Sequence, residues 1–60
     1  MTKLLRVPKA AELLNINQKA TWAMIYRREI DVVRIGRSVR IPLSALDELI
    51  ERGTVPAARN

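Results

Sequence analysis

The chain has 60 residues and a formal net charge of +5, with 11 lysines and arginines against 6 acidic residues. A chain of this length buries only about 60% of the surface it exposes when unfolded, so it can build one small core and no second domain. Because it contains no cysteine and no histidine, disulfides, thiolate or imidazole metal sites and the commonest catalytic side chains are excluded. We therefore expect a binding protein without a cofactor or metal, not an enzyme.

The composition also bears on the compartment and on the partner. The first ten residues lack the apolar segment of an export signal, and no run approaches the roughly 20 apolar residues of a membrane span. We therefore expect a soluble, intracellular protein, with no membrane partner and no small-molecule substrate. With 48% hydrophobic residues the chain should fold, and its basic balance favours a polyanion, most often nucleic acid.

The positive charge is concentrated in the middle of the chain. Residues 18–40 hold six basic and two acidic side chains, a net charge of +4, whereas residues 43–52 are net negative. This asymmetry indicates one basic face, the alternative being a solvated surface that is merely cationic.

Two short helices with a tight connection are predicted first. Residues 8–14 place their apolar side chains on one side of a helix, with Pro8 in its first turn. Asn15 can adopt the left-handed conformation that ends a helix, Ile16 is an apolar plug, and Asn17 is a favoured N-cap for the next helix. Two helices joined by three residues are typical of a helix-turn-helix motif.

The second helix is predicted from Gln18 to Arg28, about 16 Å long, which suits a DNA major groove about 12 Å wide. Ala20 and Met24 are expected to face the core. The two aromatic residues, Trp22 and Tyr26, lie one turn apart on the opposite arc. Aromatic residues at this spacing can instead belong to a core, so both alternatives stay open for this pair.

A two-stranded hairpin is predicted over residues 32–41, because apolar residues alternate with period two on both sides of a turn at 36–38. Its apolar side is expected to hold Val33, Ile35, Val39 and Ile41. Arg34 and Arg40 are expected on the other side and Arg37 at the tip, so that the hairpin forms a basic wing packed on the helices.

A third helix is predicted over residues 43–52, after Pro42 and before Gly53. Its apolar arc is expected to hold Leu43, Leu46, Leu49 and Ile50. Ser44 and Asp47 have the spacing of an imperfect capping box. The carboxylates on its other face, Asp47, Glu48 and Glu51, are expected to be solvated rather than catalytic. Residues 1–53 should thus form the domain and residues 54–60 a flexible tail.

The chain resembles the small excisionase-type DNA-binding proteins over residues 4–53. The matching residues are Leu4, Leu5, Val7, the block Ala10-Ala11-Glu12-Leu13-Leu14, Ile16, the block Val33-Arg34-Ile35-Gly36, the block Arg40-Ile41-Pro42, and Ala45-Leu46. The resemblance implies a MerR-like winged helix-turn-helix, mainly α with a small β-hairpin and a C-terminal helix. Where this family usually has glycine, the chain has Asn15 and Arg28. Trp22 and Ala23 replace a common Tyr-Arg pair, and Asp31 stands where proline is usual.

The same resemblance implies a recombination directionality factor. Such a protein binds double-stranded DNA at repeated sites beside the attachment site of a phage or mobile element, bends it and helps an integrase to excise the element. The implied partners are DNA, an integrase or recombinase, and further copies bound cooperatively at tandem sites. The implied location is the cytoplasm of a bacterial or phage-infected host cell, in association with the nucleoid. Two alternatives stay open: a small phage or plasmid transcriptional regulator with the same domain, and a protein-interaction adaptor that uses Trp22 and Tyr26.

The candidate DNA-binding residues follow from the two basic elements. On the second helix they are Gln18, Lys19, Trp22, Ala23, Tyr26 and Arg27. Glutamine can pair with adenine, lysine can meet guanine or a phosphate, and an aromatic ring can pack on a sugar or a thymine methyl group. In the wing they are Arg34, Arg37, Ser38 and Arg40, for phosphates or a narrow minor groove. The alternatives are solvation, protection of a sheet edge, and, for Arg27, attraction to the helix C-terminus.

Overall fold

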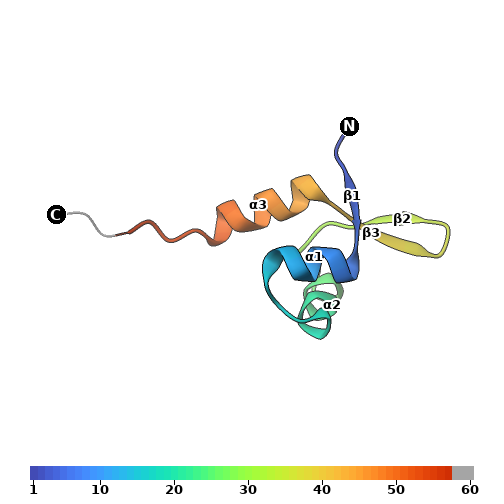
Figure 1. The fold of residues 1–60 in the computed structure, drawn as a ribbon, viewed down its shortest axis with the longest axis horizontal. Helices are drawn as coiled ribbons and strands as arrows, with labels where there is room; N and C mark the ends of the chain where they lie inside the picture. Colours follow the sequence, from blue (N-terminus) through green and yellow to red (C-terminus); the bar gives the residue numbers. More distant parts are fainter. Residues whose placement is uncertain (58–60) are drawn as a thin grey trace.

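The computed structural model of the chain describes residues 1–57 and has the elements of a small winged helix-turn-helix (Figure 1). In chain order they are β1 (Leu4–Arg6), α1 (Val7–Leu14), α2 (Gln18–Tyr26), β2 (Val33–Ile35), β3 (Ser38–Pro42) and α3 (Leu43–Gly53). The strands form an antiparallel sheet in the order β1-β3-β2. The hairpin of β2 and β3, here called the wing, projects on one side of the molecule, and α3 extends on the other.

The turn between α1 and α2 has the predicted geometry. Asn15 adopts the left-handed conformation with φ of 57°. Its backbone N–H donates to the Glu12 carbonyl, and the N–H of Ile16 donates to the Ala11 carbonyl. The Asn17 side chain then accepts from the N–H of Ala20 at 2.7 Å, which confirms it as the N-cap of α2. These bonds fix the direction in which α2 leaves the turn.

The core lies where α1, the sheet and the start of α3 meet. Its buried apolar residues are Leu5, Val7, Ala10, Ala11, Ile30, Ile41, Ala45 and Leu46. The one polar residue that is fully buried within residues 1–57 is Thr21 of α2, whose hydroxyl donates to the Asn17 carbonyl at 3.1 Å. A small threonine here lets α2 approach α1 closely while its hydroxyl stays hydrogen-bonded.

Strand β1 was not predicted from the sequence. It pairs with β3 so that Leu5 lies opposite Ile41, two of the most buried residues of the sheet. The segment before it also covers the start of α3: the N–H of Leu43 donates to the Lys3 carbonyl at 2.7 Å, and the N–H of Ser44 to the Thr2 hydroxyl at 3.2 Å. The N-terminal segment therefore supplies the cap of α3 in place of the predicted capping box.

The predicted register of the wing is wrong by one residue. Its loop has two residues, Gly36 with φ of 59° and Arg37, so that Ile35 pairs with Ser38, Arg34 with Val39 and Val33 with Arg40. Residues directly opposite each other in an antiparallel pair project to the same face of the sheet. A three-residue turn, as predicted, would pair Ile35 with Val39 and give the opposite facing.

The corrected register gives the sheet two mixed faces. The face toward the helices carries Leu5, Ile41, Val39 and Arg34, and the outer face carries Val33, Ile35, Arg40 and Arg6. The burial of these residues agrees with this assignment of the two faces, because Ile41 is fully buried and Val39 is half-buried, whereas Val33 and Ile35 are exposed. Arg34 and Arg40 therefore point to opposite sides, not to one side as predicted.

Both later helices differ in detail from the prediction. Helix α2 ends at Tyr26 rather than at Arg28, which adopts a left-handed conformation with φ of 59°. Helix α3 includes Gly53, and its Ile50 is 55% exposed although the periodicity placed it on the apolar arc. Of the predicted tail, residues 54–57 follow α3 without helix or strand, and residues 58–60 lie outside the described residues.

Candidate nucleic-acid interface

Helix α2 exposes three of its nine residues, Gln18, Lys19 and Tyr26. Gln18 and Lys19, in its first turn, are exposed, and Ala23 is half-buried. Because the Asn17 cap sets where the helix begins, these first-turn side chains lie next to backbone N–H groups that carry partial positive charge. The start of α2 is therefore polar, accessible and favourable for an anion or a base edge.

The two aromatic residues of α2 have different environments. Tyr26 is 78% exposed, as predicted. Trp22, for which a core position and an outward position both stayed open, is half-buried: it packs against the core residues and also lines the groove beside the wing. The rings are stacked, with centroids 5.9 Å apart. Because Trp22 packs against the core, its ring holds the stacked Tyr26 ring in place, and Tyr26 itself stays accessible to solvent.

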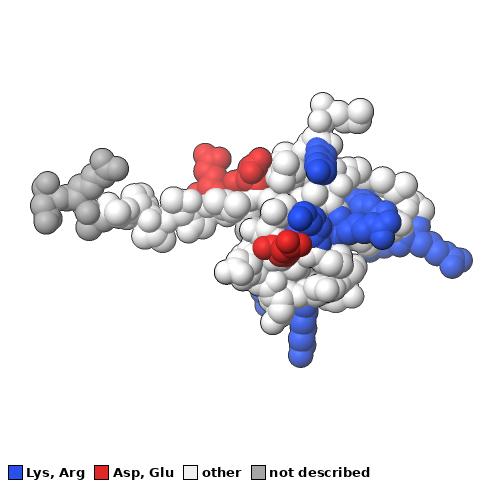
Figure 2. Space-filling view, in the orientation of Figure 1, with Lys and Arg blue, Asp and Glu red and all other residues white. Residues whose placement is uncertain are grey.

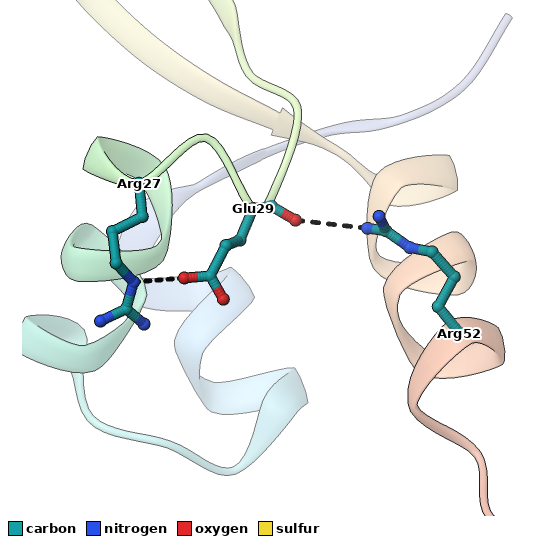
Figure 3. Close-up of polar contacts among 3 residues, drawn as sticks. All are labelled: Arg27, Glu29 and Arg52. Carbon is teal, nitrogen blue, oxygen red and sulfur yellow. Dashed lines mark hydrogen bonds and ion pairs between the residues drawn. The ribbon is translucent and has the colours of Figure 1, made fainter.

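Arg27 is engaged within the protein. Its guanidinium pairs with the Glu29 carboxylate, and the Glu29 backbone carbonyl accepts from the Arg52 guanidinium at 3.2 Å (Figure 3). These contacts join the end of α2, the connection to the wing and the last turn of α3. The arrangement gives Arg27 a role in the fold, whereas the neighbouring Arg28 makes no hydrogen bond or ion pair through its side chain within residues 1–57.

The arginines of the wing spread over both faces and the tip. Arg34 lies on the face toward α2, Arg37 lies in the loop, and Arg40 lies on the outer face directly opposite Arg6 of β1. Two like charges in directly opposite positions are mutually destabilising, so a bound anion at this pair would relieve repulsion. Ser38 is half-buried beside the loop.

A groove of about 400 Å³ separates α2 from the wing. Its lining residues are Trp22, Ile25, Tyr26, Arg28, Ile30, Asp31, Val32, Arg34 and Val39. The floor is apolar, and the charged side chains stand at its rim, two arginines and one aspartate. The groove therefore connects the surface of α2 with the inner face of the wing and keeps a positive rim.

The charge separates along the molecule (Figure 2). Basic side chains project from the wing and from the side of α1 and α2, two acidic patches lie along α3, and a further acidic patch lies beside basic side chains in the middle of the molecule. Within residues 1–57 no acidic cluster could hold a metal ion. None of the helices in this part of the chain is long and apolar enough to cross a membrane.

Two arginines near this surface were not among the predicted site residues. Arg6 was missed because β1 was missed, and a three-residue strand leaves almost no periodicity to detect. Arg28 was predicted to be the last residue of a longer helix, where attraction to the helix C-terminus is enough to explain a cation. The signal that could have marked it is its place where the related proteins usually have glycine.

Fold and surface together define a class: a helix-turn-helix DNA-binding domain with a basic wing. A family model described as a helix-turn-helix domain matches residues 4–54. The chain therefore belongs to the helix-turn-helix domain family. This membership assigns the chain a domain of the DNA-binding class.

Curated relatives agree with this class. The chain is 43% identical over 49 residues to a protein of Saccharopolyspora erythraea named a probable excisionase, a match that covers 82% of this chain and 50% of the relative. It is 30% identical over 50 residues to proteins of two Mycobacterium tuberculosis strains named as candidate DNA-binding proteins, covering 83% of this chain and 64% of each. The chain thus spans half to two thirds of the length of these relatives. No solved structure is significantly similar to it.

Proposed function

We propose that the protein is an excisionase, which binds and bends attachment-site DNA so that an integrase excises a phage or mobile element. The observation that carries this proposal is the relative named a probable excisionase, whose similarity to this chain includes the helix-turn-helix and the wing. The mycobacterial relatives support DNA binding without naming a process. The role in excision therefore extends the shared DNA-binding class.

The docking follows from the sizes of the elements. Helix α2 has nine residues, about 13 Å, and fits lengthwise in a major groove about 12 Å wide. The wing is a narrow hairpin with an arginine at its tip, which suits the adjacent minor groove, about 6 Å wide. With α2 in one groove and the wing in the next, the protein bridges one sugar-phosphate backbone.

Each element then has its own task. Gln18, Lys19 and Tyr26 are the side chains of α2 that can reach base edges or sugars, because they are exposed on its surface. Arg34 and Arg37 of the wing bind phosphates or enter the minor groove, where narrow width concentrates negative potential. Trp22 acts indirectly by supporting the Tyr26 ring.

A narrow hairpin forced into the minor groove also explains bending. Minor-groove contacts widen or compress the groove and cost a few kcal/mol, which the added phosphate contacts offset. One domain of 60 residues covers few base pairs, so we expect several copies to bind side by side on repeated sites and to bind the integrase through residues outside this surface.

The experiment that tests the proposal is a reconstituted excision reaction. Purified integrase and a plasmid carrying both attachment sites are incubated with and without this protein, and excised circles are counted. The proposal predicts that circles form efficiently only when the protein is present. A variant with Arg34 and Arg37 both changed to alanine serves as a control, because it should fold normally and fail to stimulate excision.

Binding without stimulation would overturn the excision role while preserving the DNA-binding class. In that case a small regulator is the remaining assignment, and the protein should instead change transcription from a promoter that overlaps its binding site. If neither duplex binding nor excision were observed, an adaptor function through Tyr26 and Trp22 would replace both.

A further inference from the structure

Arg28 occupies an unusual backbone position at the end of α2. Its φ is 59°, in the left-handed region. The N–H of Arg28 donates to the Ile25 carbonyl at 3.1 Å, and the N–H of Glu29 donates to the Met24 carbonyl at 2.9 Å. This pair of bonds is the helix ending in which glycine is most common, because glycine has no Cβ to clash in the left-handed conformation.

Helix α1 ends in the same way, which gives an internal comparison. Its left-handed residue is Asn15, with φ of 57° and the equivalent pair of backbone bonds. Asparagine adopts this conformation more readily than most residues. Arginine has no such advantage, so the end of α2 carries a conformational cost that the end of α1 largely avoids.

Contacts within the protein do not account for an arginine at this position. The Arg28 side chain is exposed and makes no hydrogen bond or ion pair with residues 1–57, whereas the adjacent Arg27 pairs with Glu29. Within residues 1–57, Arg28 lines two grooves. One lies between α2 and the wing, and the other lies beside Glu29 and the end of α3.

The groove between α2 and the wing is where a DNA strand must pass. When α2 lies in the major groove and the wing in the adjacent minor groove, the sugar-phosphate backbone between the two grooves runs across the space that separates them. Arg28 stands on the α2 side of this space and Arg34 on the wing side. The Asp31 carboxylate lies at the same rim, so both arginines are needed to keep the site positive.

We propose that Arg28 is a DNA phosphate-binding residue, held at a costly left-handed position because its guanidinium there meets the backbone strand between α2 and the wing. At this left-handed position Arg28 lines the groove between α2 and the wing, together with Arg34. A phosphate between Arg28 and Arg34 would be bound from both sides. This inference rests on the proposed docking of α2 and the wing, and not on the role in excision.

The test separates stability from binding with three variants at one position. Arg28→Gly removes both the charge and the conformational cost, Arg28→Ala removes the charge alone, and Arg28→Lys keeps the charge. Thermal melting and duplex affinity at several salt concentrations are measured for each variant. Two matched controls complete the set: Asn15→Gly changes the other left-handed position without changing charge, and Lys3→Gln removes one charge from a residue that does not line the groove.

The expected results differ for each variant. Arg28→Gly should melt about 2–6 °C higher than the unchanged protein, yet bind duplex DNA roughly threefold to tenfold more weakly, with a log–log salt slope shallower by about 0.9. Arg28→Ala should lose the same binding without the gain in melting temperature. Arg28→Lys should keep the slope, and both controls should leave the slope within experimental error.

Two outcomes overturn the inference. If Arg28→Gly binds DNA with the affinity and slope of the unchanged protein, Arg28 does not contact a phosphate. If Arg28→Gly melts at a lower temperature than Arg28→Ala, the left-handed conformation at this position has no conformational cost for a residue other than glycine, and the premise of the inference is wrong. Failure of the proposed function looks different, because the unchanged protein would then bind DNA without stimulating excision while the differences among the Arg28 variants persist.

Discussion

Helices α2 and α3 are similar in length but use their surfaces differently. In α3, Ala45 and Leu46 are buried in the core and acidic side chains cover the other face, the ordinary pattern of an amphipathic helix. In α2 the one fully buried residue is Thr21, and the exposed side chains are Gln18, Lys19 and Tyr26. The difference indicates that α3 contributes stability and that α2 contributes a surface for binding.

The charges reinforce this contrast. The segment 18–40 carries a net charge of +4, and α3 carries −2. An acidic α3 would repel DNA, so it favours one orientation of the domain, with α2 and the wing toward the duplex and α3 away from it. Substitutions in the two helices should therefore separate cleanly into losses of stability and losses of binding.

The largest expected effect is on stability, from Leu46→Ala in α3. Leu46 is 2% exposed, and removal of a buried leucine side chain costs about 2–5 kcal/mol. This cost is comparable to the whole free energy of unfolding of a domain this small. Circular dichroism during thermal or urea unfolding should show a protein that is largely unfolded at 37 °C.

The control lies one turn further along the same helix. Ile50→Ala should change the free energy of unfolding by less than about 1 kcal/mol, because Ile50 is already 55% exposed. Equal losses from Leu46→Ala and Ile50→Ala would show that the apolar arc expected from periodicity, and not the observed burial, is correct.

The next effect is on binding, from Tyr26→Ala in α2. Because the Tyr26 ring is 78% exposed, the fold should be retained, and duplex affinity should fall roughly fivefold to tenfold, about 1 kcal/mol. Fluorescence anisotropy with a labelled duplex measures the affinity. Trp22→Ala is the comparison, and it should lower both affinity and melting temperature because Trp22 also packs against the core. A Tyr26→Ala protein with a destabilised fold and unchanged duplex affinity would show that the ring serves the fold and does not contact DNA.

A smaller loss of stability is expected from Asn17→Ala at the start of α2. This change removes the bond from the N–H of Ala20 to the Asn17 side chain, which costs about 1 kcal/mol. The melting temperature should fall by roughly 4–8 °C. Asn17→Asp keeps an accepting oxygen and should recover most of the loss; no recovery would mean that the cap does not stabilise α2.

The smallest effect is expected from Arg37→Ala in the wing loop. Because Arg37 is exposed and makes no ion pair within residues 1–57, the free energy of unfolding should not change. The log–log dependence of affinity on salt should become shallower by about one unit, the signature of one lost phosphate contact. An unchanged slope would remove Arg37 from the DNA contacts.

The helix-turn-helix was predictable because local chemistry determines it. Asn15 and Asn17 are residues whose conformational and capping preferences act over three or four positions, and the structure has both in their predicted roles. The hairpin was predictable as an element but not in its facing, since loops of two and three residues give opposite faces. One residue in the loop therefore decided where Arg34 and Arg40 point.

The features that the sequence could not reveal depend on distant contacts. Strand β1 exists because β3 offers it a pairing edge, more than thirty residues further along the chain. Trp22 packs against the core although periodicity placed it on the outer arc of α2. Thr21 is the one fully buried residue of this nine-residue helix, so larger neighbouring side chains also reach the core. Arg28 and Arg34 can be placed on the two sides of the groove only when the register of the wing and the end of α2 are known.

The central claim is that α2 and the wing form one surface that binds duplex DNA largely through its phosphates. The most direct measurement is the affinity of the unchanged protein for a labelled duplex as a function of salt concentration. Four to six phosphate contacts predict a log–log slope of about −4 to −5. A slope near zero, or no duplex binding at low salt, would contradict the claim.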